Sequence, residues 1–80
     1  HGGIITTIMD ISMGHLIKNE QSAGTTLELK VNFMSALNNE KIKCIGSFLK
    51  KGRTISTLDS KLFREDGKLA AYATSTWKIL

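Results

Sequence analysis

Residues 26–33 alternate strictly between polar and apolar side chains, with every odd position apolar and every even position polar. A period of two places all the apolar side chains on one face of a β-strand. Residues 3–18 follow another pattern, because at 100° per residue their apolar side chains gather along one side of a helix. The chain is therefore expected to form a helix followed by strands, and the helix covers the apolar face of the sheet.

The helix is expected to bury one apolar face and to carry small or polar side chains on the opposite stripe. The expected apolar face holds Ile5, Ile8, Met9, Ser12 and Leu16, with Ile4, Ile11 and His15 on its flank. The opposite stripe holds Gly3, Thr6, Asp10 and Gly14, with Thr7 and Ile17 toward its edges. Asp10 is thus expected to point away from the apolar face. Either this stripe faces solvent, or its small side chains admit another chain or a ligand.

Three more strands are expected after residue 38, where Asn38-Asn39 marks a turn. The first begins at about residue 42, the second covers residues 54–63, and the third runs from about residue 69 to 79. A turn at Lys51-Gly52 joins the first two. The segment Glu65-Asp66-Gly67-Lys68 predicts a tight hairpin, because Asp-Gly tolerates positive φ. These elements predict an α+β fold in which a helix packs on a four-strand antiparallel meander.

The composition limits the class of protein. Eighty residues form one domain at most, with a marginal core, and association with other copies is the expected route to stability. The single cysteine, Cys44, forms no internal disulfide and fits a reducing cytoplasm. No Cys/His cluster has zinc-ligand spacing, so no metal is expected. No apolar run approaches the roughly 20 residues that span a bilayer.

The net charge of +4 favours an anionic partner, although the basic residues are spread along the chain. A nucleic-acid-binding sheet would interleave aromatic residues with lysines on an exposed face. The few aromatic residues here do not follow that pattern, since Phe33 and Phe48 lie on the apolar sides of their strands. Nucleic acid is therefore not the expected partner.

His1-Gly2-Gly3 stands at the start of the expected helix, and Asp10 follows within it. Backbone N–H groups in the first turn of a helix have no intrahelical partner and can hold a developing oxyanion. A carboxylate supplies a general base or a nucleophile. Gly2 and Asp10 are separated by about 12 Å of helical rise, so one helix cannot bring both to one carbonyl. Two antiparallel copies can, which predicts a dimer.

Several short motifs resemble, in their order and spacing, the hotdog-fold acyl-CoA thioesterases of the phenylacetic-acid-degradation type. The resemblance covers essentially all 80 residues. Its motifs are His1-Gly2-Gly3, Asp10, the strand that closes with Phe33-Met34-Ser35, the Lys51-Gly52-Arg53 turn and Asp66-Gly67-Lys68-Leu69-Ala70. The resemblance implies one hotdog domain over residues 1–80, in which an antiparallel sheet wraps the helix.

The chain departs from this family at two points. The family's sheet has further strands before the histidine-glycine-glycine motif, so residues 1–80 look like the C-terminal major part of the domain. The upstream asparagine that often polarises the thioester carbonyl is missing with them. Ala36 stands where many relatives carry proline, which leaves the local turn open.

The resemblance also implies roles for individual residues. The expected catalytic set is Asp10, Gly2 and Thr26. The Gly2 N–H binds the thioester oxygen, and Asp10 activates water or attacks the carbonyl carbon; both routes stay open. Thr26 falls near the position of a serine or threonine that orients the aspartate or the water, and an ordinary threonine on the polar strand face is an equal alternative. The expected substrate-binding residues are His1, Gly3, Lys51, Gly52 and Arg53.

The resulting hypothesis is a cytoplasmic homodimer or homotetramer that hydrolyses an acyl- or aryl-CoA thioester to free acid and coenzyme A. It needs no metal and no cofactor beyond the coenzyme A of its substrate, and neither nucleic acid nor membrane is an expected partner. The alternative is a non-catalytic hotdog module that binds acyl-CoA or mediates assembly. Asp10 separates the two, because a binding module has little need of a carboxylate beside an anionic ligand.

Overall fold

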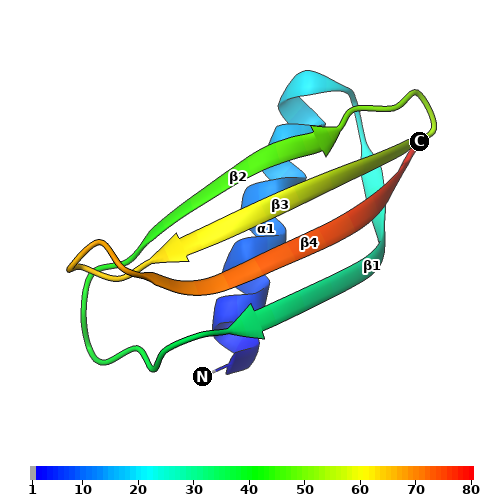
Figure 1. The fold of residues 1–80 in the computed structure, drawn as a ribbon. Coiled ribbons are helices and arrows are strands. Elements are labelled where there is room, and N and C mark those ends of the chain that lie inside the picture. Colours follow the sequence, from blue (N-terminus) through cyan, green and yellow to red (C-terminus); the bar gives the residue numbers. More distant parts are fainter. Residues whose placement is uncertain (1) are drawn as a thin grey trace.

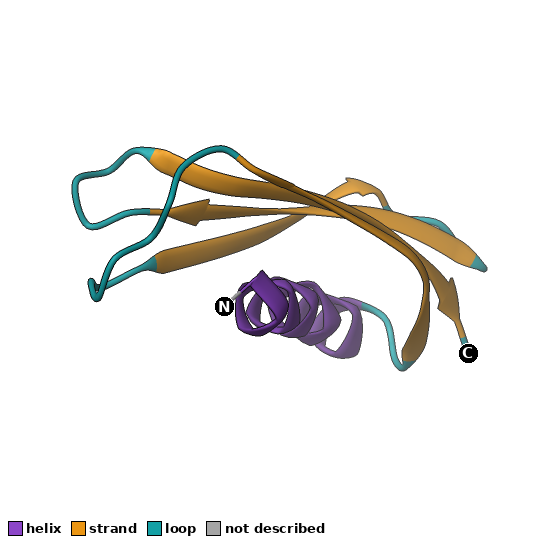
Figure 2. Ribbon diagram, turned by 90° about the horizontal axis from the view of Figure 1, so that it is seen from below, coloured by secondary structure: helices purple, strands orange, loops and turns teal. Residues whose placement is uncertain are grey.

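The computed structural model describes residues 2–80. Helix α1 (Gly2–Glu20) is followed by β1 (Gly24–Phe33), β2 (Lys43–Lys50), β3 (Ile55–Phe63) and β4 (Leu69–Ile79). The helix lies on one face of a single antiparallel sheet and crosses its strands obliquely (Figures 1 and 2). The predicted α+β class is confirmed. No helix in the described range is long and apolar enough to cross a membrane.

The strand order is β1-β4-β3-β2, so the predicted four-strand meander is wrong. β2 pairs with β3 and β3 pairs with β4, as in a meander, but β1 pairs antiparallel with β4 and not with β2. After β1 the chain passes to the far edge of the sheet through residues 34–42 (Figure 1). That segment is longer than the roughly two to five residues that join hairpin strands. Nothing local therefore forces β1 to pair with β2.

The core lies between α1 and the sheet. Met9, Met13 and Ile17 recur every four residues on the helix and are at most 1% exposed. They pack with buried residues of β3 and β4, namely Leu58, Leu62, Ala70, Ala71, Ala73 and Trp77. A close approach also occurs at Gly46 of β2, where a Cβ would lie 3.1 Å from Leu16 Cδ1.

The buried helix face is rotated from the predicted one. Ile17 is buried although it was assigned to the opposite stripe, whereas Ile4 and Ile11 are 64% and 53% exposed. Isoleucines occur nearly all around this helix, so the pattern alone does not decide which side meets the sheet. Gly14 faces Trp77, because a Cβ at Gly14 would lie 3.2 Å from the indole atom Cη2. The space at Gly14 thus admits a side chain of the same molecule.

A β-bulge interrupts the alternation in β1. Thr26 pairs with Trp77 and Glu28 with Thr76, which leaves Leu27 as an extra residue that is 55% exposed. An extra residue reverses the face on which the following side chains lie. Thr26 consequently faces the helix, on the same side as the core-packed Leu29 and Val31. The strict alternation predicts Thr26 and Leu29 on opposite faces, and the bulge corrects this.

Candidate active site

Asp10 lies in the middle of α1, half-buried, on the flank of the helix that faces β1. The Thr26 hydroxyl donates a hydrogen bond to Asp10 Oδ1 over 3.1 Å. Among residues 2–80, no donor contacts the second carboxylate oxygen. The expectation that Asp10 points away from the sheet is therefore wrong, because the rotation of the helix carries it toward β1. The alternative of Thr26 as an outward strand residue is also wrong.

The first turn of α1 presents backbone N–H groups that the helix itself does not use. The helix begins at Gly2, and its first turn contains no acidic side chain. Its first N–H groups lack intrahelical acceptors and lie at the positive end of the helix dipole. Gly3 is exposed, and a Cβ there would meet nothing within 4 Å. His1, an expected pocket residue, lies outside the described range. This end is suited to bind an oxygen that gains negative charge.

The structure does not bring Gly2 and Asp10 together within one chain. The helix is continuous across both, so about 12 Å of axial rise separates them. A reacting carbonyl group needs its oxyanion donor and its base within roughly 3–4 Å. A single copy therefore holds two half-sites.

Lys51, Gly52 and Arg53 lie at the opposite end of α1, roughly 27 Å along the helix from Gly2. Gln21, just after the helix, donates from Nε2 to the Gly52 carbonyl over 2.7 Å. The buried Ser56 hydroxyl lies 2.8 Å from Gln21 Oε1 and accepts from the Gly52 N–H over 3.0 Å. The turn is thereby tied to the end of the helix.

The two cations of this turn differ in their surroundings. Lys51 forms an exposed ion pair with Glu20 at 3.1 Å, and its Nζ lies 5.4 Å from the centre of the Phe48 ring. Arg53 is exposed. A Cβ on Gly52 would overlap the Ile55 carbonyl oxygen, so glycine is required there by packing. Its expected role as a substrate contact is therefore limited to its backbone.

Two polar clusters escaped the sequence-based reasoning. Ser12 Oγ of the helix lies 3.0 Å from Ser60 Oγ of β3, and Cys44 Sγ lies 3.1 Å from the same hydroxyl. Cys44 is half-buried, packs against the hydrophobic core and also contacts these two hydroxyls. On the other sheet face, Asp59 accepts hydrogen bonds from Ser47 and Tyr72. Because these contacts join residues of separate secondary-structure elements, no local motif reveals them. Within the described chain, no group of His, Cys, Asp and Glu side chains is arranged to hold a metal ion.

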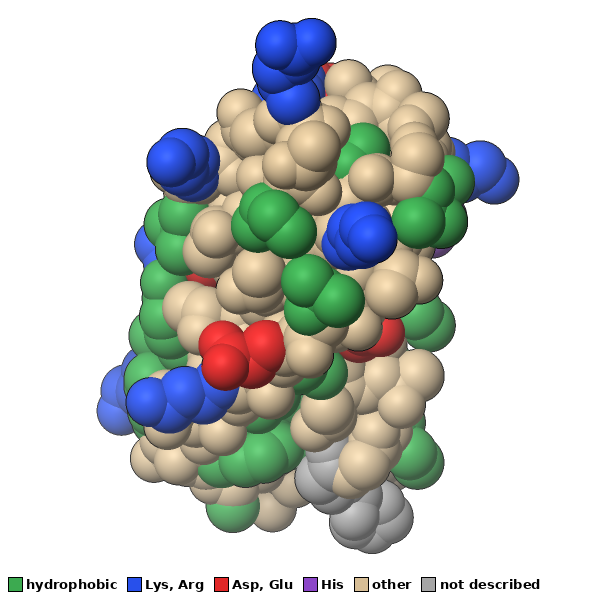
Figure 3. All heavy atoms as spheres, turned by 90° about the vertical axis from the view of Figure 1, so that its right-hand side faces the viewer, with side chains coloured by type: hydrophobic (Ala, Val, Ile, Leu, Met, Phe, Trp, Pro, Cys, Tyr) green, Lys and Arg blue, Asp and Glu red, His purple; other side chains and the backbone are tan. Residues whose placement is uncertain are grey.

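The strands β1 and β2 form the two edges of the sheet. Figure 3 shows the side of the molecule that carries the β1 edge, where hydrophobic side chains reach the surface at several places. Leu27 and Phe33 of β1 are each more than half exposed, and so is Met34, the residue that follows the strand. An unpaired edge with exposed apolar side chains favours contact with another chain.

The comparisons with known proteins agree on one family. Residues 1–71 match the model of the thioesterase superfamily. A protein of Saccharolobus solfataricus that carries an esterase name is 37% identical over 82 residues, which cover all of this chain and 59% of that protein. A second esterase-named protein of the same organism is 22% identical. The chain thus spans about three fifths of the first of these relatives.

Solved structures show the same fold. The structure of a thioesterase-named protein of Streptococcus pneumoniae with coenzyme A has a TM-score of 0.96 and 25% identity, covering all of this chain and 63% of that one. Variants of that protein with an aspartate or a threonine replaced by alanine have also been solved. A Streptococcus mutans protein bound to acetyl-CoA has a TM-score of 0.94 and 25% identity, covering 65% of that chain. Because the family model matches most of this chain, the chain belongs to the thioesterase superfamily.

Proposed function

We propose that the protein hydrolyses acyl-CoA thioesters in a site shared between two antiparallel copies. Asp10 of one copy is the general base or nucleophile, and the Gly2 N–H of the other is the oxyanion donor. One observation carries the proposal: Thr26 holds Asp10 on the flank of a helix whose first residue, Gly2, lies about 12 Å away along the axis. Each half-site lacks what a second copy supplies.

The chemistry needs only these groups and water. The Gly2 N–H stabilises the negative oxygen as the carbonyl becomes tetrahedral. Asp10 takes a proton from the attacking water, or attacks first and forms an anhydride that water then opens. In either route the carbon–sulfur bond breaks, the coenzyme A thiolate leaves and takes up a proton, and the free acid is released.

Three further observations support this assignment. The aspartate and threonine replaced in the pneumococcal variants have the same spacing as Asp10 and Thr26, 16 positions. Two similar structures hold coenzyme A or acetyl-CoA. The motifs around Gly2, Asp10 and the Lys51–Arg53 turn further favour the phenylacetic-acid-degradation type within the superfamily, which we retain as part of the proposal.

The Lys51–Arg53 turn is proposed to contact the coenzyme A phosphates from the copy that supplies Asp10. Along one helix, Asp10 lies about 15 Å of rise from Glu20, the ion-pair partner of Lys51. Gly2 lies much farther from this turn. The forked guanidinium of Arg53 suits phosphate oxygens and is exposed.

The first experiment measures thiol release from short, medium, long-chain and aryl acyl-CoAs by the intact protein. Asp10→Asn is expected to lower turnover by about 100-fold or more with the oligomer intact. Glu28→Gln, which removes an exposed carboxylate of β1, is the matched control and is expected to leave turnover unchanged. Negligible release by the unaltered protein, with acyl-CoA still bound, would favour the non-catalytic module.

A second experiment tests whether the site is shared. Gly2→Pro removes the proposed N–H donor while keeping a residue that suits the first helical position. Mixing inactive Asp10→Asn and Gly2→Pro proteins, with subunit exchange, regenerates one complete site in each mixed dimer. About a quarter of the original activity is expected to return, because half of the dimers are mixed. No recovery despite demonstrated exchange would exclude the shared site.

A further inference from the structure

An apolar groove runs beside the N-terminal half of α1, where the segment 37–42 lies against the helix. It has a volume of about 450 Å³, within the range of about 300–1,000 Å³ typical of small-molecule sites. Its walls are mostly aliphatic: Ile4, Ile5, Ile8, Leu37 and Ile42, with Asn38, Asn39 and Glu40 beside them. The groove is therefore large enough and apolar enough to hold a hydrocarbon group.

The groove continues to Gly3 in the first turn of the helix. A second, shallower hollow is lined by Gly3, Ile4, Thr7 and Ile8, and it shares Ile4 and Ile8 with the groove. Gly3 directly follows Gly2, whose N–H is the proposed oxyanion donor. An acyl group whose carbonyl oxygen lies at Gly2 thus has a continuous apolar path into the groove.

Glu40 fixes the outer wall of this groove. Its Oε1 accepts a hydrogen bond from the Glu65 N–H at 3.0 Å and its Oε2 accepts one from the Asn38 N–H at 3.1 Å. Arg64 Nε lies 3.6 Å from the same carboxylate. These contacts tie the segment 37–42 to the turn between β3 and β4. They also lower the pKa of Glu40, so its carboxylate stays charged and paired with Arg64 at neutral pH.

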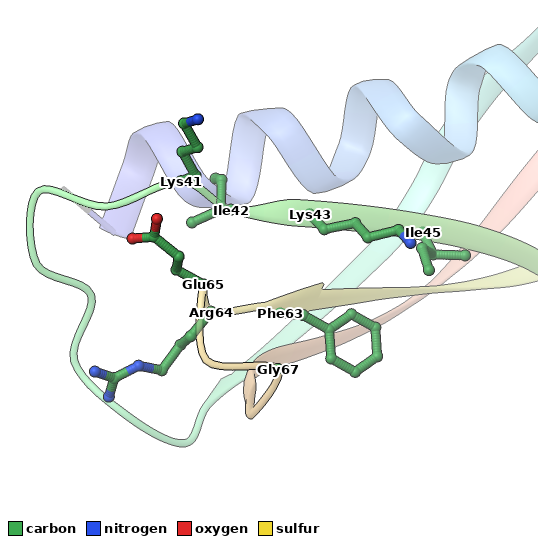
Figure 4. A pocket seen from close by; sticks show the side chains of 8 residues that line it. All are labelled: Lys41, Ile42, Lys43, Ile45, Phe63, Arg64, Glu65 and Gly67. Atoms are coloured by element: carbon green, nitrogen blue, oxygen red, sulfur yellow. The ribbon is translucent and has the colours of Figure 1, made fainter.

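A larger hollow, of about 520 Å³, lies on the other side of Ile42 and is shown in Figure 4. Its cations do not converge, because Lys41, Lys43 and Arg64 point in different directions (Figure 4). It offers no common point at which an anion or an acyl group would be held. The groove beside α1 is the better candidate, since its walls are aliphatic and it continues to Gly3.

The assignment of the coenzyme A phosphates orients a thioester relative to the groove. The groove belongs to the copy that supplies Gly2, and its one charged lining residue is the acidic Glu40, whereas the basic Lys51–Arg53 turn comes from the copy that supplies Asp10. A coenzyme A moiety carries phosphates, which favour the basic turn and are repelled by a carboxylate. The uncharged acyl group is left to occupy the apolar groove.

We propose that this groove binds the acyl group of the substrate and selects uncharged hydrocarbon chains, with Ile8 and Ile42 setting the length that fits. The inference rests on the proposed function and deepens it by naming the substrate class. Acyl groups that end in a carboxylate, such as succinyl, are disfavoured because the charge would lose its hydration against the aliphatic walls.

The test uses two stable thioether analogues, S-octyl-CoA and S-ethyl-CoA, with the intact protein and titration calorimetry. The octyl analogue is expected to bind at least about tenfold more tightly than the ethyl analogue, since methylenes are transferred from water into the groove. Ile8→Phe, which fills the groove, is expected to abolish this difference and to keep the affinity for S-ethyl-CoA. Ile55→Phe, at an isoleucine 43% exposed in β3 and outside the groove, is the matched control.

A second variant guards against misfolding. Ile42 is 38% exposed, so Ile42→Phe narrows the groove with less disturbance of the core, and thermal melting checks both variants. Persistence of the full octyl preference in both folded variants would overturn the groove assignment, as would equal binding of the two analogues by the unaltered protein. If neither analogue binds, the proposed function fails as well. If S-octyl-CoA binds more tightly than S-ethyl-CoA but the acyl-CoA thioesters release no thiol, the groove assignment is supported and only the catalytic proposal fails.

Discussion

The Thr26 hydroxyl lies 3.1 Å from Asp10 Oδ1 because the bulge at Leu27 turns Thr26 toward the helix. If Leu27 occupied a regular position in the ladder, the alternation that places Leu29 and Val31 on the core would place Thr26 outside. The hydrogen bond therefore depends on a local irregularity in an edge strand, and bulges are frequent where a side chain must be aimed at a site.

Thr26 is expected to act by positioning Asp10. Thr26→Val keeps the shape of the side chain but removes the donor, so turnover of acyl-CoA is expected to fall about tenfold. Thr26→Ser restores the hydroxyl and is expected to recover most of the activity. The loss is expected in kcat with KM little changed, because the hydroxyl positions the carboxylate and does not bind the substrate. An unchanged kcat with lowered stability would indicate a merely structural threonine.

The bulge itself can be removed. Deletion of Leu27 leaves Thr26 paired with Trp77 and Glu28 with Thr76, so both strand faces keep their side chains. We expect this variant to fold, with a loss in free energy of unfolding of about 1–2 kcal/mol and lower activity from the changed twist at Thr26. Deletion of Leu29 reverses the face of part of the strand and is expected to unfold the protein. Circular dichroism melting compares the two deletions.

Gly52 is expected to be essential for folding. Gly52→Ala places a Cβ onto the Ile55 carbonyl oxygen, which is backbone and cannot move aside easily. A loss of more than about 2 kcal/mol in unfolding free energy is expected. Gly67→Ala is the control, because its Cβ has open space and only the φ of +88° opposes it, at a cost of about 1–2 kcal/mol. Equal stability of both alanine variants in urea unfolding would contradict this assignment.

Glu40 makes stability depend on pH in the acid range. Its pKa is lowered mainly by hydrogen bonds from the Glu65 and Asn38 N–H groups, from an ordinary value of 4.5. A lowered folded-state pKa contributes stability that is fully present above 4.5 and is lost as the pH falls through the folded-state pKa. Glu40→Gln is thus expected to melt at a lower temperature than the unaltered protein at pH 7. The difference is expected to shrink below pH 4.5.

Tyr72, the only tyrosine of the sequence, reports on the buried Asp59 carboxylate. Its hydroxyl donates to Asp59 Oδ2 over 2.9 Å, and this bond raises the pKa of Tyr72 above the ordinary 10.0. The stabilisation is therefore fully present below pH 10.0 and is lost as the pH rises through the folded-state pKa. Ultraviolet titration is expected to show ionisation above pH 10.0, and Asp59→Asn to move it back toward that value.

The sequence alone determined the features that depend on neighbours along the chain. The change from a helical period to a period of two separates α1 from the strands, and Asp66-Gly67 forms a turn in which Gly67 has a φ of +88°. The spacing of Gly2 and Asp10 on one continuous helix likewise follows from the sequence and the rise per residue. These features are local, and intrinsic backbone preferences suffice to specify them.

Tertiary packing decided the strand order, the rotation of the helix and the orientation of Thr26. The connection over residues 34–42 is too long to specify its strand's neighbour, and isoleucines on nearly every side of α1 leave its rotation open until Met13 and Ile17 meet the sheet. The bulge at Leu27 arises only in the pairing of β1 with β4. The contact of Asp10 with Thr26 requires the strand order, the helix rotation and the bulge together. Hydrophobic burial between distant segments, and not local preference, selects these three features.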